Sequence, residues 1–350
     1  DFEAVSVSLA SILNQDLRDI EVICVNDGAV GTALDELEKL SLSDRRVRLV
    51  SQLRGGRGAA CNLGISLARG DALMFVRAGD CLSSTHALAD LWNALCGCDA
   101  LVCAGSVSFA NQTGEVRGFP SYEDSFYSFV TEKDIPINQV WNDVGWNRCL
   151  YNTKLFAGGV CSFPHLSRYE ASVFFLSAVC LSGALHVIPE KVCCHRLHNR
   201  SVAMSVSECR DFLTGIRTNL RVAARLRMAE LYTTLIARIN NEFYEDIIRN
   251  IADAAGLLLL VSIQGELRPD LILMSCDAGQ DARVIRPLAT LSGRIACVSQ
   301  ADARQEVSCS EPRDQAIVRF AKHVAGSRVY TGAQSLVWRA KSFVGRLGAR

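Results

Sequence analysis

Residues that could bind a polar ligand lie together in the stretch Arg46–Leu82. A short β-rich run ends there in a glycine-rich turn at residues 55–58, and a helical pattern follows. The apolar run Ala72–Val76 then predicts a strand buried on both faces. In an open α/β sheet, ligands bind just beyond the carboxyl ends of such strands. Because Arg77-Ala78-Gly79-Asp80 comes next, we expect Arg77 and Asp80 to face a ligand.

The turn residues have two interpretations each. Asp27 follows the predicted strand Ile20–Val25, so it is either a ligand-binding carboxylate at a strand end or a turn residue that caps the next helix. Gly56 and Gly58 either permit a tight turn or let the backbone approach a ligand closely. Asp80 has a similar alternative as the N-cap of a helix that begins near residue 83.

Strand and helix signals alternate through the first hundred residues. This β-α-β-α-β order predicts an α/β fold with a mostly parallel, Rossmann-like sheet flanked by helices. Residues 201–256 are predicted to be a helical segment. Strand-like runs return at Leu257–Ile263, Leu271–Met274 and Ile295–Val298, so residues 257–350 are predicted to form a C-terminal α/β appendage.

Composition excludes several classes of protein. Among 350 residues, Lys and Arg together number 37, as do Asp and Glu, so no basic field favours nucleic acid. The 15 cysteines form no C-x-x-C pair, which predicts reduced thiols, no metal site built from them, and a cytoplasmic location. The apolar run Ala254–Val261 is too short to span a bilayer. Basic residues among aromatic ones near the end, such as Arg339 and Lys341, would suit peripheral association with an anionic membrane.

Five blocks in order resemble the signature sequences of family-two glycosyltransferases. Ser11–Gln15 with Ile20–Gly28 is similar to SILNQ…IEIIxVDDGS, and Gly55–Gly64 to GGxGxARNxG. The other blocks are these: Phe75–Leu82 (FLDADDxL), Trp146–Tyr151 (WNKLY), and Phe163–Phe174 (FPxGxxYEDxxF). The resemblance covers roughly residues 9–200 and implies a GT-A fold for a domain at residues 1–200. The family's usual opening strand would precede residue 1, so we expect an N-terminal piece to be missing.

The resemblance also implies an activity. Such enzymes transfer a sugar from a nucleotide-diphosphate donor to a glycan or other acceptor, commonly with Mg²⁺ or Mn²⁺. By position, Asp27 matches an aspartate that can bind the nucleotide base, and Gly56 and Gly58 lie in the donor-side block. Asp80 remains from the acidic loop, so donor-binding residues are expected to be Asp27, Gly56, Gly58, Arg77 and Asp80.

The chain departs from the family pattern at four chemically central positions. Arg77 and Gly79 stand where two aspartates would hold the metal, which argues against a bound Mg²⁺ or Mn²⁺ because hard cations require oxygen ligands. Cys61 replaces an arginine that faces the phosphates. Ala171 replaces the acceptor-activating aspartate, which leaves the neighbouring Glu170 as the candidate catalytic base. Arg77 is either an exposed residue of a loop or a fixed cation that offers two N–H donors to a diphosphate.

Three functions are therefore compared. The first is a glycosyltransferase, and the second is a catalytically impaired relative that acts as a binding or scaffold partner in glycan assembly. The third is a dinucleotide-binding oxidoreductase, since Gly56-x-Gly58-x-x-Cys61 followed by Asp80 imitates that motif with cysteine at its third glycine. His195 is expected to be a structural histidine, and Trp146 either a core residue or a platform for a sugar ring.

Overall fold

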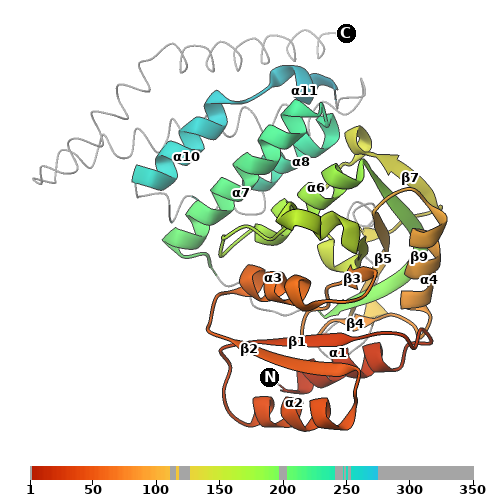
Figure 1. The fold of residues 1–350 in the computed structure, drawn as a ribbon. Helices are drawn as coiled ribbons and strands as arrows, with labels where there is room; N and C mark the ends of the chain where they lie inside the picture. The colour runs from red at the N-terminus through yellow and green to blue at the C-terminus, as the bar shows by residue number, and fades with distance from the viewer. Residues whose placement is uncertain are drawn as a thin grey trace, which may run out of the picture. The chain divides into compact units, whose positions relative to one another are not determined.

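The computed structural model describes residues 2–110, 116–117, 127–196, 203–240, 247, 250 and 254–274. The chain divides into two compact units, residues 1–202 and 203–350, and each is described by itself (Figure 1).

A two-stranded parallel sheet carries the N-terminal part of the first unit. Strands β1 (Val22–Asp27) and β2 (Val47–Gln52) pair in register from Val22 opposite Val47 to Asp27 opposite Gln52. The sheet lies between α2 (Thr32–Ser43), which packs on β2, and α3 (Arg57–Leu67), which packs on β1 (Figure 1). Helix α1 (Phe2–Leu13) contributes Leu9, which is buried with Val22 and Val47.

The larger sheet of the first unit has seven strands among the described residues. Its order is β3-β8-β5-β9-β4, with β6 paired to β5 and β7 paired to β9. The strands and helix α4 have these bounds: β3 Ala72–Met74, β4 Cys81–Leu82, α4 Ala87–Gly97, β5 Val102–Ala110, β6 Val116–Arg117, β7 Lys133–Pro136, β8 Cys149–Asn152 and β9 Ala184–Arg196.

Strand directions in this sheet are mixed. The longest pairing, β5 with β9, is parallel, and helix α6 (Glu170–Ser182) leads into β9. The shorter strands pair antiparallel to their neighbours. Antiparallel neighbours need no crossover helix, so β8 enters directly from the 3₁₀ turn η2 (Trp146–Arg148). The irregular stretch Ser106–Gly118 predicts a hairpin, which the β5–β6 pair confirms. The alternation did not predict the antiparallel pairing of β3, β4, β7 and β8.

An aromatic cluster fills the space between the sheet and α6. The Phe75 ring lies 5.4 Å from Phe163 and 5.5 Å from both Trp146 and Phe174, between ring centroids. The rings of Phe163 and Phe174 stack at 3.9 Å. Gly58 of α3 packs here, because a Cβ on it would lie 3.3 Å from both the Phe163 Cβ and the Glu170 Cγ.

The described part of the second unit is helical. Helix α7 (Val206–Arg225) begins with a capping box, in which Ser205 and Glu208 bond each other's backbone N–H groups. It is followed by α8 (Ala229–Asn240), α10 (Ala254–Gly265) and α11 (Pro269–Met274). Helix α7 packs against α8 and α10, and α8 against α11.

The strands predicted at Leu257–Ile263 and Leu271–Met274 are wrong, because these residues lie in α10 and α11. A continuous apolar run does not distinguish a buried strand from a buried helix by its periodicity. The run Ile295–Val298 and the basic residues near the C-terminus lie outside the described residues. Within the described part, no helix has the length and hydropathy that a membrane crossing requires.

Gly58 provides a test of the packing between α3 and the aromatic cluster. We expect Gly58→Val to lower the free energy of unfolding by about 1–3 kcal/mol, because the added carbons meet Phe163, Glu170 and the Pro164 carbonyl. Gly97→Val, at the end of α4 where an added Cβ meets nothing within 4 Å, is the matched control and should change little. Thermal unfolding of both variants measures this, and equal melting temperatures would contradict the packing role.

Glu266 joins the helices of the second unit through ion pairs. It accepts hydrogen bonds from Arg221 Nε at 2.8 Å and Arg217 Nε at 3.1 Å. The hydrogen bonds from Arg221 and then Arg217 lower the pKa of Glu266 from 4.5 to about 2.

Because this pKa is depressed in the folded state, the contribution to stability is full above pH 4.5 and is lost as the pH falls toward 2. Glu266→Gln should therefore cost about 1 kcal/mol at neutral pH after solvent screening, and the difference from wild type should shrink in acid. Glu230→Gln, at an exposed position of α8, is the control and should change stability little. A difference that stays constant from pH 7 to pH 3 would rule out the ion pairs as its source.

Candidate functional site

Asp80 is a buried carboxylate that joins three parts of the chain. Its residue is only 4% exposed. Its Oδ2 accepts from Asn147 Nδ2 at 3.1 Å and lies 2.9 Å from His195 Nδ1, and its Oδ1 accepts from the backbone N–H of Arg196 at 3.3 Å. The N-cap of α4 is His86, so the alternative that Asp80 caps this helix is wrong. Asp80 instead fixes η2 and the end of β9 against the loop that precedes β4.

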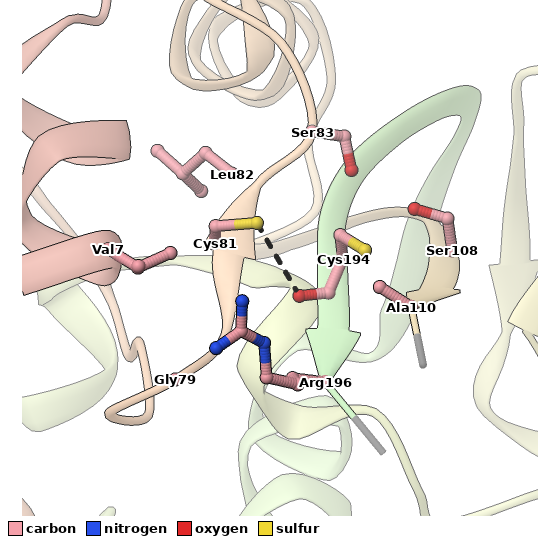
Figure 2. Close-up of a pocket in the computed structure, with 9 residues that line it drawn as sticks. All are labelled: Val7, Gly79, Cys81, Leu82, Ser83, Ser108, Ala110, Cys194 and Arg196. Carbon is pink, nitrogen blue, oxygen red and sulfur yellow. Dashed lines mark hydrogen bonds between the residues drawn. The ribbon is translucent and has the colours of Figure 1, made fainter. Parts of the chain in front are cut away.

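A cavity of about 280 Å³ adjoins this loop. Figure 2 shows the guanidinium of Arg196 directed toward the turn at Gly79 and Cys81. The residues that line the cavity are Val7, Gly79, Cys81, Leu82, Ser83, Ser108, Ala110, Cys194 and Arg196. Sequence reasoning missed Arg196, although its place at the carboxyl end of a strand is the same signal that identified Asp27.

Arg77 lies at the edge of the same loop. Its side chain is 48% exposed, and its Nε is 3.9 Å from Asp80 Oδ2. Both carboxylate oxygens of Asp80 already accept hydrogen bonds, and Gly79 brings no side-chain oxygen. A hard divalent cation needs several oxygen ligands, so the residues present here do not fit Mg²⁺ or Mn²⁺.

Glu170, the candidate base, is held in an ion pair with Arg57. The Glu170 side chain is 2% exposed, and its Oε1 lies 2.7 Å from Arg57 Nε and 2.6 Å from Arg57 Nη2. Its Oε2 is buried and has no hydrogen-bond partner among the described residues. The Arg57 guanidinium also lies 5.8 Å from the centre of the Trp146 ring. The Arg57 guanidinium therefore holds the Glu170 carboxylate in place. The neighbouring Ala171 is buried and has no titratable group.

Asp27 holds the glycine-rich turn. Its Oδ1 accepts from the Gly55 N–H at 2.7 Å and from Gln52 Nε2 at 2.7 Å, and its Oδ2 accepts from the Gly56 N–H at 2.9 Å. The hydrogen bond from Gly55, followed by that from Gln52, lowers the pKa of Asp27. Gly56 is the N-cap of α3 with a φ of 85°, a conformation that favours glycine. Asp27 thus fixes the turn before α3, not the start of α2, whose N-cap is Gly31.

Cys61 lies one helical turn after Arg57 on α3. Burial raises the pKa of its thiol to about 12, and the nearby Arg57 lowers it by a smaller amount. The thiol is therefore neutral at physiological pH and does not replace the positive charge of an arginine. Arg57 is the residue of this helix that brings a guanidinium to the aromatic cluster.

The structure brings the predicted residues into three groups. Asp27 contacts Gly56, Gly58 contacts Glu170, and Arg77 lies near Asp80. The turn η2 connects the last two groups, because Trp146 lies under Arg57 and the next residue, Asn147, bonds Asp80. No described contact joins Asp27 directly to Asp80 or Glu170.

The Glycosyl transferase family 2 model matches residues 3–156. EpsH of Bacillus subtilis, a glycosyltransferase by name, is 26% identical over 204 residues, which cover 55% of this chain and 57% of EpsH. The poly(ribitol-phosphate) beta-glucosyltransferase of Bacillus spizizenii is 26% identical over 181 residues, or 50% of this chain and 27% of that protein. The chain thus spans about half, or less, of the length of these relatives.

A solved structure supports the fold. S. aureus TarS 1–349 in complex with UDP-GlcNAc superimposes with a TM-score of 0.51 at 16% identity, covering 85% of this chain and 79% of that chain. This likeness confirms the α/β class and the predicted GT-A fold.

The same findings bear on the oxidoreductase alternative. Nothing in these matches favours a dinucleotide-binding oxidoreductase. Gly58, the second glycine of the dinucleotide-binding motif, packs against Phe163 and Glu170. Over residues 3–156, therefore, the chain is similar to glycosyl transferase family 2.

Proposed function

We propose that the first unit binds a nucleotide-diphosphate sugar and transfers its sugar to a glycan or other acceptor. The observation that carries this proposal is the cavity beside Asp80, with the Arg196 side chain directed toward Gly79 and Arg77 at the edge of the same loop. Two guanidinium groups near one cavity suit a diphosphate, because a planar arginine fork donates paired hydrogen bonds to phosphate oxygens. UDP is the first probe, since the TarS structure contains UDP-GlcNAc.

In this proposal, arginines replace the divalent cation. The diphosphate leaving group gains negative charge during sugar transfer, and fixed positive charges stabilise it. Arg196 is anchored because its backbone N–H bonds Asp80, while the more exposed Arg77 is available to move toward the phosphates. Asp80 then acts as a positioning residue that orients both arginines and binds no metal.

A second candidate function follows from the position of Glu170. A general base must contact the hydroxyl that it deprotonates, and a missing base typically costs about 10²–10⁴-fold in rate. Ala171 has no such group, and Oε1 of the buried Glu170 is engaged by Arg57. This arrangement favours a domain that binds the donor and serves as a partner in glycan assembly with little transfer of its own.

Donor binding is expected to be independent of metal. UDP and UDP-sugars should raise the melting temperature of the full chain in the presence of EDTA, since a ligand at about 100 times its Kd stabilises a protein by about 2.7 kcal/mol. Arg196→Gln and Arg77→Gln should each weaken binding about tenfold or more, whereas Arg45→Gln, at an exposed position before β2, should not. A shift that requires Mn²⁺ would refute the metal-free site, and no shift with any nucleotide would refute donor binding.

Donor hydrolysis distinguishes the two candidate functions. A panel of nucleotide sugars, each assayed with and without Mn²⁺, should release nucleotide above background if the domain transfers sugar. Glu170→Gln should then reduce the rate about 10²-fold or more if this carboxylate is the base. Donor binding without hydrolysis, and no effect of Glu170→Gln on donor affinity, would support the non-catalytic partner.

A further inference from the structure

A second cluster of chemically active side chains lies in the first unit. Cys98, Asp134 and His186 offer ligand atoms that all lie within 4.8 Å of one another. They come from three different segments: Cys98 follows α4 as its C-cap, Asp134 lies on β7, and His186 lies near the start of β9. The residues Arg196 and His195, by contrast, are at the other end of β9.

Strand pairing fixes two of these side chains. Asp134 and His186 are directly opposite each other in the antiparallel β7–β9 pair, so their side chains emerge on one face. His186 Nδ1 lies 2.8 Å from Asp134 Oδ1. The imidazole is 8% exposed, whereas the Asp134 side chain is 59% exposed and free to adjust its angle.

Both ring nitrogens of His186 face carboxylate oxygens. The second nitrogen, Nε2, lies 3.2 Å from Glu132 Oε1. A metal ion on one ring nitrogen, with the N–H on the other, would satisfy both contacts.

Three carboxylates, those of Asp134, Asp99 and Glu132, lie near the Cys98 thiol. Their negative charge attracts a cation. A thiol that coordinates a divalent metal loses its proton and binds as a thiolate.

We propose that Cys98, Asp134 and His186 bind a Zn²⁺ ion. One sulfur, one nitrogen and one oxygen ligand form a mixed set that suits Zn²⁺, and Mg²⁺ and Ca²⁺ prefer oxygen alone. The metal takes the place of the proton between His186 Nδ1 and Asp134. His186 Nε2 then keeps its proton and donates a hydrogen bond to Glu132 Oε1, which is the carboxylate–histidine–metal arrangement that orients ligating histidines.

The movement that this site requires is small. Tetrahedral Zn²⁺ with ligand distances of about 2.0–2.3 Å places ligand atoms about 3.3–3.8 Å apart. The longest separation between the ligand atoms, at most 4.8 Å, must therefore shorten by about 1 Å. Rotation of the exposed Asp134 side chain supplies part of this movement. A water molecule completes the fourth position. The bound ion would tie the end of α4 to the β7–β9 pair, which is a structural role independent of the donor site.

Cobalt provides the direct test, because a cysteine ligand to Co²⁺ produces a near-ultraviolet sulfur-to-metal charge-transfer band. The full chain, reduced and stripped with a chelator, is titrated with Co²⁺ and then with Zn²⁺ in competition with a chromogenic indicator. We expect one equivalent to bind, the band to appear, and Zn²⁺ to displace Co²⁺. Zn²⁺ should also raise the melting temperature.

Matched variants assign the band to this site among the 15 cysteines. Cys98→Ser should abolish it, and Asp134→Asn, a near-isosteric change at an exposed position, should weaken metal binding about tenfold or more. Cys96→Ser, two residues away and exposed, should leave both unchanged. Absence of a charge-transfer band in the wild type, or equal bands in Cys98→Ser and Cys96→Ser, would overturn the proposal.

Discussion

The candidate site depends on one buried negative charge, the carboxylate of Asp80. Removing a carboxylate from water costs several kcal/mol unless hydrogen bonds and positive charge compensate. Here Asn147, His195 and the backbone of Arg196 supply the compensation, so η2 and the end of β9 must take fixed positions around the loop. Backbone pairing also holds this loop against β9, because β4 begins at Cys81, directly after Asp80, and pairs antiparallel with β9.

The Glu170–Arg57 pair is a second buried polar contact, and it shares η2 with the first. Trp146 and Asn147 are adjacent, yet one lies under the Arg57 guanidinium and the other bonds Asp80. The short turn η2 therefore sets the distance between the loop that carries Arg77 and the start of α6. The turn η2 is also packed against the aromatic cluster, where the Trp146 ring lies 5.5 Å from both Phe75 and Phe163.

Sequence signals identified local secondary structure but missed contacts between residues that are far apart in the chain. The strand-turn-helix-strand order around residues 46–82 follows from glycine positions and apolar runs. The resemblance of the five sequence blocks predicted the GT-A fold. The partners of Asp80 could not be predicted in this way, because His195 is 115 residues away and nothing in its surroundings marks it. The same holds for Glu170 and Arg57, which are separated by 113 residues.

One error, and one cluster that the spacing of residues did not reveal, have a physical origin. The strand prediction at Leu257–Ile263 failed because its residues are apolar on all sides, a composition that both buried strands and buried helices share. The cysteine count was judged by spacing along the chain. Cys98 meets its neighbours Asp134 and His186 only after β7 pairs with β9, so spacing could not reveal the cluster.

The contact between Asp27 and the turn before α3 has a consequence for where an anion can bind. The first N–H groups of a helix, with the positive end of its dipole, normally attract phosphate. In this chain the Asp27 carboxylate already accepts hydrogen bonds from the N–H groups of Gly55 and Gly56. Its lowered pKa keeps it ionised. A phosphate in solution would have to displace a competitor held at very high effective concentration. The glycine-rich turn is therefore held by an anion of the chain itself, the Asp27 carboxylate.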